Sequence, residues 1–127
     1  MGALFSKSMN ASVKDAVLGI KPGMCSNEYC IQRYLARRLM ARYHVVIDGI
    51  EVDVLGNGWA AEVKMGSHFY DGIGQALAYR RILGIEEVWL IHVVDGDPSQ
   101  HLNKLPLLIA GLGIMAAIVH RGGVEFI

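Results

Sequence analysis

Asp53, Glu62 and Lys64, near the middle of the chain, have side chains of the types that support metal-dependent phosphoryl chemistry. They belong to two short apolar runs, 50–55 and 59–65, which are separated by a Gly-Asn-Gly turn typical of a β-hairpin. Because successive side chains of a strand point to opposite faces, Glu62 and Lys64 share one face. A hairpin with this spacing is expected to bring all three side chains together over one patch of sheet.

The charges of such a patch indicate its chemistry. Two neighbouring carboxylates repel each other unless a cation lies between them. Oxygen-rich sites of this kind suit Mg²⁺ or Mn²⁺, which keep open positions for phosphate oxygens. A lysine on the same face can orient or help to deprotonate an attacking water, and it can neutralise charge on a phosphate. The pattern therefore predicts metal-assisted phosphodiester hydrolysis, and the alternative is a surface hairpin with simple cross-strand or i,i+2 ion pairs.

More than one acid could face the metal. Alternation places Glu51 on the face of Asp53, where it could assist, and Asp48 is a further rival just before the hairpin. Asp53 is favoured because it lies nearest the turn that leads to Glu62. The opposite face of the first run is predicted to carry Ile50, Val52 and Val54.

A third acid comes from a helix predicted to start after an N-cap at Ser26 or Asn27 and to run to about Arg42. Glu28 lies in the first turn of this helix, on the face of its apolar stripe. If the helix packs on the sheet, Glu28 points at the carboxylate patch. The alternative is that Glu28 only complements the helix dipole.

The other predicted elements are a strand at 43–48, a helix from 70 or 71 to about 83, a strand at 87–94, a helix at 100–110, a strand at 113–120 and an edge strand at 124–127. Pro106 disturbs the middle of the third helix, which could instead begin near Lys104 with the proline in its first turn. The order α-β-β-β-α-β plus a C-terminal α-β-β predicts an α/β fold with a central mixed β-sheet flanked by helices.

These residues resemble the PD-(D/E)XK nuclease superfamily. Asp53 precedes Glu62-Val63-Lys64 on the next strand, behind a helix with Glu28, and the segment VDVLGNGWAAEVK is similar to the motif region of archaeal Holliday junction resolvases. The resemblance implies a restriction-endonuclease-like core over roughly half the chain. It also implies that Asp53, Glu62 and the Val63 carbonyl bind the metal, that Glu28 is an outer or second-metal ligand, and that Lys64 positions the nucleophilic water.

The helix after the E-x-K strand carries a second pattern, Q-x-x-x-Y, formed by Gln75 and Tyr79. It resembles the exonuclease branch that includes the nuclease domains of bacterial recombination helicase-nucleases. Residues at i and i+4 share a helix face, so both side chains could reach the active site or the DNA strand entering it. An ordinary amphipathic helix with Tyr79 half-buried is the alternative. The chain departs from the superfamily in having Val52 at the position of its proline, and it lacks the cysteine set of an iron–sulfur cluster, so no cluster is expected.

Several basic side chains are suited to contact DNA phosphates without reading sequence. They are Arg33, Arg37, Arg38 and Arg42 on the first helix and Arg80 and Arg81 on the second. Each arginine could equally belong to a solvated helix face. His68, in the loop after the E-x-K strand, could contact phosphate or shuttle a proton, whereas His92 is predicted to be a core histidine.

Composition limits the class of protein only loosely. The chain has 127 residues, 53% of them apolar, and 12 basic residues balance 12 acidic ones. Zero net charge gives no reason to expect a nucleic-acid partner and excludes none, because local clustering sets the field at a binding face. We expect an N-terminal arm at 1–26, with one short helix near 11–18, and a single nuclease domain at 27–127. The longest apolar stretch, 105–119, is too short to span a membrane, so a cytoplasmic protein without a membrane partner is expected.

Cys25 and Cys30 lie just before and inside the first predicted helix and match no zinc-site pattern. Free thiols are the favoured prediction. The alternative is a local disulfide, which would be normal only in an oxidising compartment or in the cytosol of a hyperthermophile.

The expected function is that of a metal-dependent deoxyribonuclease that hydrolyses DNA phosphodiester bonds in a structure-selective or non-specific way. One alternative is a Holliday junction resolvase acting as a dimer. Another is a catalytically inactive nucleic-acid-binding or assembly protein of the same fold. A homodimer would extend the binding face, and the apolar region from 105 to 118 could supply its interface or could equally be core.

Overall fold

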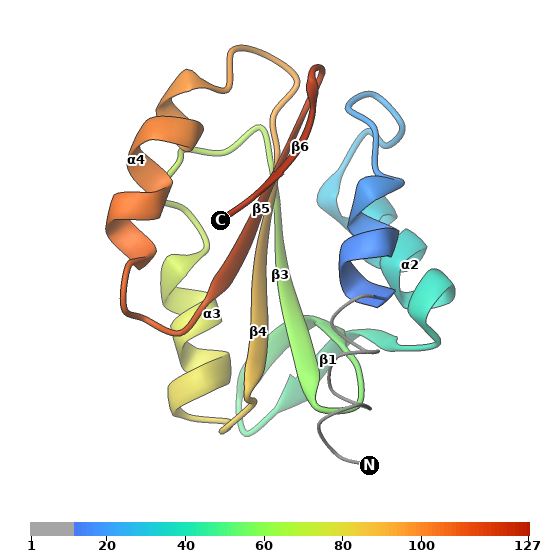
Figure 1. Ribbon diagram of the computed structural model, residues 1–127. Helices are drawn as coiled ribbons and strands as arrows, with labels where there is room; N and C mark the ends of the chain where they lie inside the picture. The colour runs from blue at the N-terminus through green and yellow to red at the C-terminus, as the bar shows by residue number, and fades with distance from the viewer. Residues whose placement is uncertain (1–11) are drawn as a thin grey trace.

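A six-stranded mixed sheet forms the centre of the structure, a computed structural model that describes residues 12–127 (Figure 1). The strands lie across the sheet in chain order, with β3, β4 and β5 parallel and the other neighbours antiparallel. Their bounds are β1 Arg42–Ile47, β2 Ile50–Leu55, β3 Trp59–Met65, β4 Glu87–Val93, β5 Met115–His120 and β6 Gly123–Phe126. The predicted α/β architecture with a mixed sheet flanked by helices is confirmed.

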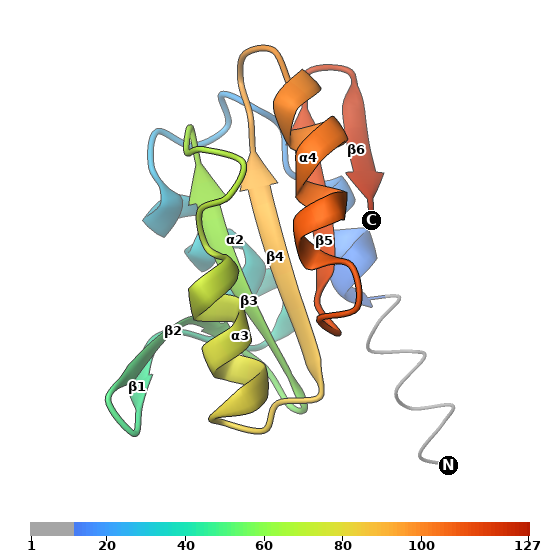
Figure 2. The ribbon, with the colours of Figure 1, turned by 90° about the vertical axis from the view of Figure 1, so that its left-hand side faces the viewer.

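Helices cover both faces of this sheet. α3 (Ile73–Arg81) and α4 (Ser99–Ile109) lie on one face, and α2 (Glu28–Leu39) lies on the other with a helical segment at 12–18 (Figures 1 and 2). The sheet therefore separates two apolar clusters. β4 is buried on both sides, as its continuous apolar sequence predicts for a central parallel strand. Among residues 12–127, no helix has the length and apolar character that crossing a membrane would need.

The described part of the predicted arm packs into the domain. Val13, Ala16, Val17 and Ile20 are buried in the cluster under α2, and the Tyr34 hydroxyl donates a hydrogen bond to the Ala16 carbonyl at 2.9 Å. Residues 12–26 are therefore not separate from the domain predicted to start at residue 27. Residues 1–11 of the predicted arm lie outside the described part of the chain.

The ends of two helices differ from the prediction. Asn27 is the N-cap of α2 and accepts a hydrogen bond from the Cys30 N–H at 2.8 Å, but the helix ends at Leu39 because Met40 is left-handed with φ of 53°. Arg42 consequently belongs to β1 and not to the first helix. α3 starts only after Gly72, whose φ of 86° favours glycine. A Cβ there would also stand 2.7 Å from the side chain of Leu90.

The third predicted helix, α4, keeps its full length with Pro106 inside it, so the alternative of a start near Lys104 was wrong. His101, Leu105 and Ile109 recur at i,i+4 spacing and are all buried. Packing of this face stabilises the helix enough to offset the hydrogen bond that the proline cannot donate.

Cys25 and Cys30 form a disulfide, so the prediction of free thiols was wrong. The chain turns just before α2, which brings the two Cα atoms to 5.6 Å. The short loop that the bond closes contains the N-cap Asn27 and Glu28. Both residues are therefore held at the start of α2.

Replacing Ile20 by Ala tests whether residues 12–20 belong to the folded core. The side chain is 1% exposed among apolar neighbours, so we expect the free energy of unfolding to fall by about 2–4 kcal/mol. Leu18→Ala is the matched control, because Leu18 is 49% exposed and should change stability by less than about 0.5 kcal/mol. Urea denaturation measures both, and equal small effects would show that this segment does not contribute to the core.

Candidate functional site: an acidic cleft where two strands separate

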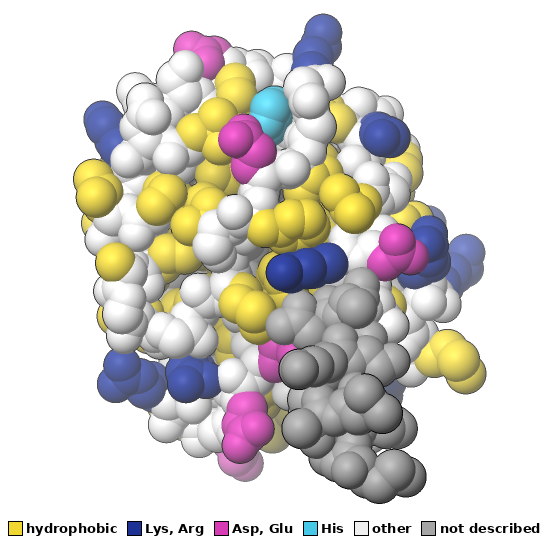
Figure 3. Space-filling model, in the orientation of Figure 1, with side chains coloured by type: hydrophobic (Ala, Val, Ile, Leu, Met, Phe, Trp, Pro, Cys, Tyr) yellow, Lys and Arg dark blue, Asp and Glu magenta, His cyan; other side chains and the backbone are white. Residues whose placement is uncertain are grey.

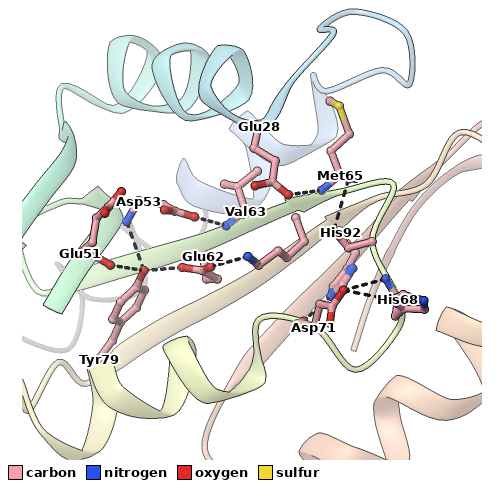
Figure 4. A network of polar contacts seen from close by, with 12 residues as sticks. Glu28, Glu51, Asp53, Glu62, Val63, Met65, His68, Asp71, Tyr79 and His92 are labelled. Carbon is pink, nitrogen blue, oxygen red and sulfur yellow. Dashed lines mark hydrogen bonds and ion pairs between the residues drawn. The ribbon is translucent and has the colours of Figure 1, made fainter.

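β2 separates from β3 at Asp53. The two strands pair only through Val54 with Ala61 and Leu55 with Ala60, so the next backbone N–H groups along this edge of β3 need other acceptors. Asp53 Oδ2 accepts a hydrogen bond from Val63 N at 2.9 Å. One step further along the edge, Glu28 Oε2 accepts from Met65 N, also at 2.9 Å (Figure 4). Two carboxylates thus replace the missing strand along this edge.

The separation changes which face the β2 side chains occupy. Val54 lies in the cluster under α2, whereas Val52 lies in the cluster under α3, so the prediction that both share one face was wrong. In β1, His44 lies between the residues that pair with Val54 and Val52, and it has a left-handed φ of 57°. The backbone is therefore irregular on both sides of Asp53, and simple alternation does not hold there.

Tyr79 links the two separated strands. Its ring is fully buried, and its hydroxyl donates a hydrogen bond to Glu62 Oε1 and accepts one from Asp53 N at 3.2 Å. The carbonyl oxygen of Glu51 lies 3.1 Å from the same hydroxyl (Figure 4). The alternative of a half-buried tyrosine on an ordinary amphipathic helix was wrong. The Tyr79 side chain instead projects from α3 to the Glu62 carboxylate.

Burial determines the protonation of this group. Glu62 is 3% exposed, and this burial, together with the charge of Asp53, raises its pKa to about 7. Burial also raises the pKa of Asp53. Burial alone would lower the pKa of Lys64. The nearby carboxylates of Glu62 and Glu28 have the larger effect and raise this pKa. Lys64 Nζ lies 3.3 Å from Glu62 Oε2. Lys64 is therefore protonated at neutral pH.

These side chains line one open cleft of about 680 Å³ between α2 and the hairpin. It brings together five of the six predicted catalytic residues, and the sixth, Tyr79, lies directly behind Glu62. The residues that line this cleft include Glu28, Tyr29, Gln32, His44, Glu51, Asp53, Glu62, Lys64 and Gln75. Of the rival acids, Glu51 lines the cleft and pairs with His44 at 3.0 Å, whereas Asp48 is exposed in the turn after β1. Asp53 is the rival whose carboxylate acts on Glu62, because its charge contributes to the raised pKa of Glu62.

Two further residues of α2 line the cleft and were not predicted from the sequence. Gln32 is 6% exposed, and its Oε1 has no hydrogen-bond partner within residues 12–127. Tyr29 is exposed at the rim. Gln32 follows Glu28 by four positions, which places both on one helix face. That spacing was the signal available in the sequence.

The predicted nucleic-acid-binding arginines lie elsewhere. Arg33, Arg37 and Arg38 line a separate cleft of about 480 Å³ beside the disulfide, and Arg38 pairs with the exposed Asp15 at 3.1 Å. Arg80 and Arg81 line a third cleft, where Arg80 donates to the Glu86 carbonyl at 2.6 Å. The face seen in Figure 3 likewise carries basic side chains in small separate groups with apolar side chains between them.

Two buried histidines hold the loop between β3 and α3. His92 Nε2 lies 2.9 Å from the Asp71 carbonyl oxygen, and His101 Nε2 lies 3.1 Å from that of Ser67. Burial lowers the pKa of His92 to about 4, so the ring is neutral at pH 7, and the prediction of a core histidine is confirmed. His68 is exposed on the same loop, where its Nδ1 lies 3.5 Å from the Asp71 carboxylate. This loop fixes the start of α3 and hence the position of Tyr79.

The donor set fits a magnesium ion. Within residues 12–127 no three His, Cys, Asp or Glu side chains already stand together at metal-binding distance. Mg²⁺ needs fewer, since it is commonly held by one or two carboxylates and keeps several waters. Asp53 and Glu62 supply two carboxylates, and the Val63 carbonyl faces the same open edge as its N–H. Burial raises the pKa of both acids, and a bound cation would favour their charged forms.

Comparisons of the chain with protein-family models, with curated proteins and with solved structures found no match. The protein is therefore classified by its fold and by the residues of its site. The protein is an α/β domain that gathers four acids and a lysine in one cleft where two strands of its sheet separate.

Replacing Glu62 by Gln should stabilise the metal-free protein at pH 8. The pKa of Glu62 is about 7 in the folded protein against an ordinary value of 4.5. Below pH 4.5 the group is neutral in both the folded and the unfolded states. As the pH rises from 4.5 through 7 the unfolded state loses its proton first, so the folded state loses stability. Gln keeps a neutral group of the same size. We expect a gain on the order of 2 kcal/mol at pH 8 that disappears near pH 4.5, measured by urea denaturation in EDTA.

Glu86→Gln is the control for this measurement, because Glu86 is exposed and its side chain lies outside the acidic cleft. It should show no comparable difference between the two pH values. If Glu62→Gln changed stability equally at pH 8 and pH 4.5, the pKa of Glu62 would not be raised in the folded protein.

Proposed function

We propose that the protein is a metal-dependent deoxyribonuclease that hydrolyses DNA phosphodiester bonds. The observation that carries this proposal is the convergence of Asp53, Glu62 and Lys64 in one cleft, with the Val63 carbonyl at the same strand edge. The same residues and the order of the elements support a restriction-endonuclease-like core and a place in the PD-(D/E)XK nuclease superfamily.

In this proposal Asp53, Glu62 and the Val63 carbonyl hold Mg²⁺ or Mn²⁺, and Glu28 is an outer or second-metal ligand. The bound ion supplies charge stabilisation to the phosphodiester and lowers the pKa of a water. Asp53 and Glu28 each use one oxygen to accept from the β3 backbone, which fixes both carboxylates in place. Tyr79 acts through Glu62 as a positioning residue, since its hydroxyl donates to Oε1 and sets the orientation of that carboxylate.

Lys64 is assigned the role of a hydrogen-bond donor and not of a base. Its pKa is raised by the surrounding carboxylates, so the ammonium group keeps its proton at neutral pH. In that state it can orient the attacking water and stabilise charge that develops on a phosphate oxygen. Gln75 is exposed on the cleft wall, where its amide can contact the DNA strand.

Contacts of these kinds address phosphates, which carry no sequence information directly. Structure-selective or non-specific cutting follows from the proposal. A resolvase would additionally need a homodimer. In the region from 105 to 118, Leu105, Ile109, Ile114 and residues 116–118 are buried, whereas Leu107 and Leu108 are exposed on α4. A cytoplasmic location stays a prediction, and the disulfide would be unusual in most cytosols.

Cleavage assays test the function directly. Wild-type protein with Mg²⁺ or Mn²⁺ should cut at least one of single-stranded, duplex and four-way-junction DNA, and EDTA should abolish cutting. Glu62→Gln should lower the cleavage rate by about 10²-fold or more, because it removes a metal ligand and its charge. Glu86→Gln is the matched control, and it should cut like the wild type because this exposed acid is outside the cleft.

The other outcomes identify the alternatives. Protein that binds DNA but cuts no substrate with either metal would be a catalytically inactive binding or assembly protein. Paired symmetric nicks made preferentially in junctions would indicate a dimeric resolvase.

A further inference from the structure

We propose that the rim of the acidic cleft binds an unpaired nucleobase, so that single-stranded DNA is the preferred substrate of the nuclease. This inference rests on the proposed function and names the substrate class of the same site. Two α2 residues carry it, Tyr29 and Gln32. Neither has been given a role in the metal site.

Tyr29 forms a fixed aromatic surface at the rim. Its ring makes edge-to-face contacts with Tyr43, at 5.4 Å between centroids, and with His44, at 5.9 Å. These contacts hold the ring in place, and yet 46% of the residue is exposed, where it lines the cleft. An ordered and exposed aromatic ring is the type of group on which a nucleobase stacks.

Gln32 supplies a polar partner inside the cleft. It follows Tyr29 by three positions on α2, so the two side chains are neighbours on the helix surface. The residue is 94% buried, and its Oε1 has no hydrogen-bond partner within residues 12–127. A buried amide oxygen without a partner is costly, and a bound N–H donor would remove that cost. Nucleobase edges present such donors, and the amide can serve both donors and acceptors of a base.

The charges of the cleft argue against a site built on phosphate attraction alone. Four acids line it, namely Glu28, Glu51, Asp53 and Glu62, against one lysine, Lys64. A phosphate backbone gains little from this field without a cation, whereas stacking on Tyr29 does not depend on net charge. Affinity gained in this way should fall only slowly with added salt.

Stacking also selects the state of the DNA. A base inside a duplex has both faces covered by its neighbours, so only an unpaired base can lay a face on Tyr29 without unstacking. The rim residue Tyr29 directly follows Glu28 in the chain, so a base bound there places its own strand beside the metal ligands. The geometry thus favours single-stranded ends, loops or flaps over blunt duplex.

Fluorescence anisotropy with a labelled single strand and a blunt duplex of equal length, in EDTA so that cutting is stopped, measures the preference. We expect the wild type to bind the single strand about tenfold or more tightly than the duplex. Tyr29→Ala should remove most of that preference, Tyr29→Phe should keep it, and Gln32→Leu should weaken single-strand binding several-fold. Tyr70→Ala is the matched control, because Tyr70 is 53% exposed but lies outside the acidic cleft.

Thermal unfolding of each variant separates a binding effect from a folding defect. The inference is overturned if Tyr29→Ala folds and keeps the wild-type ratio of single-strand to duplex affinity. It is also overturned if binding falls steeply with salt and is lost in Arg33→Ala and Arg37→Ala instead, since the arginine cleft would then be the DNA site. In either case Mg²⁺-dependent cutting by the wild type would leave the nuclease proposal standing. Wild type that binds no DNA in EDTA would overturn the inference, and wild type that also cuts no DNA with Mg²⁺ or Mn²⁺ would overturn both.

Discussion

The separation of β2 from β3 at Asp53 is the constraint on which the site depends. Beyond Ala61 the edge of β3 has backbone N–H groups that its neighbour no longer accepts. Unpaired backbone donors are costly away from water, so acceptors must be found close by. Asp53 and Glu28 provide them, from the separating strand and from the first turn of α2. The acids are therefore part of the fold before any ligand arrives, and their positions are set by the backbone they complete.

This arrangement has an electrostatic cost that the surrounding residues offset only in part. Asp53 and Glu62 are brought close in a region that water reaches poorly, and the pKa of each rises. Tyr79 has one hydroxyl proton for two acceptors, the Glu62 carboxylate and the Glu51 carbonyl. When Glu62 is protonated it can donate to the hydroxyl, which can then turn its own proton to Glu51. The network can thus remain hydrogen-bonded with or without the extra proton.

The sequence predicted the order of all elements from α2 onward, because turn residues and apolar runs mark each of them. It predicted the faces of β3 correctly but those of β2 incorrectly, since alternation assumes a paired strand and β2 bends away at Asp53. The disulfide, the end of α2 and the intact helix around Pro106 depend on tertiary contacts that local patterns do not contain. Gln32 shares a helix face with Glu28, but its burial and its lack of a hydrogen-bond partner are known only from the folded chain.

α2 also explains how a chain of zero net charge holds two opposite local fields. Glu28, Tyr29 and Gln32 line the acidic cleft, whereas Arg33 and Arg37 line the separate cleft beside the disulfide. At about 100° per residue the two arginines lie about 140° and about 180° around the helix from Glu28, although Arg33 is only about 40° from Tyr29. The arginines therefore cannot neutralise the acids across the helix, and the acidic cleft keeps its negative charge. A phosphate is attracted to the arginine cleft, whereas the acids of the other cleft repel it unless a cation is bound. The proposed metal dependence is consistent with this separation of charges on the helix.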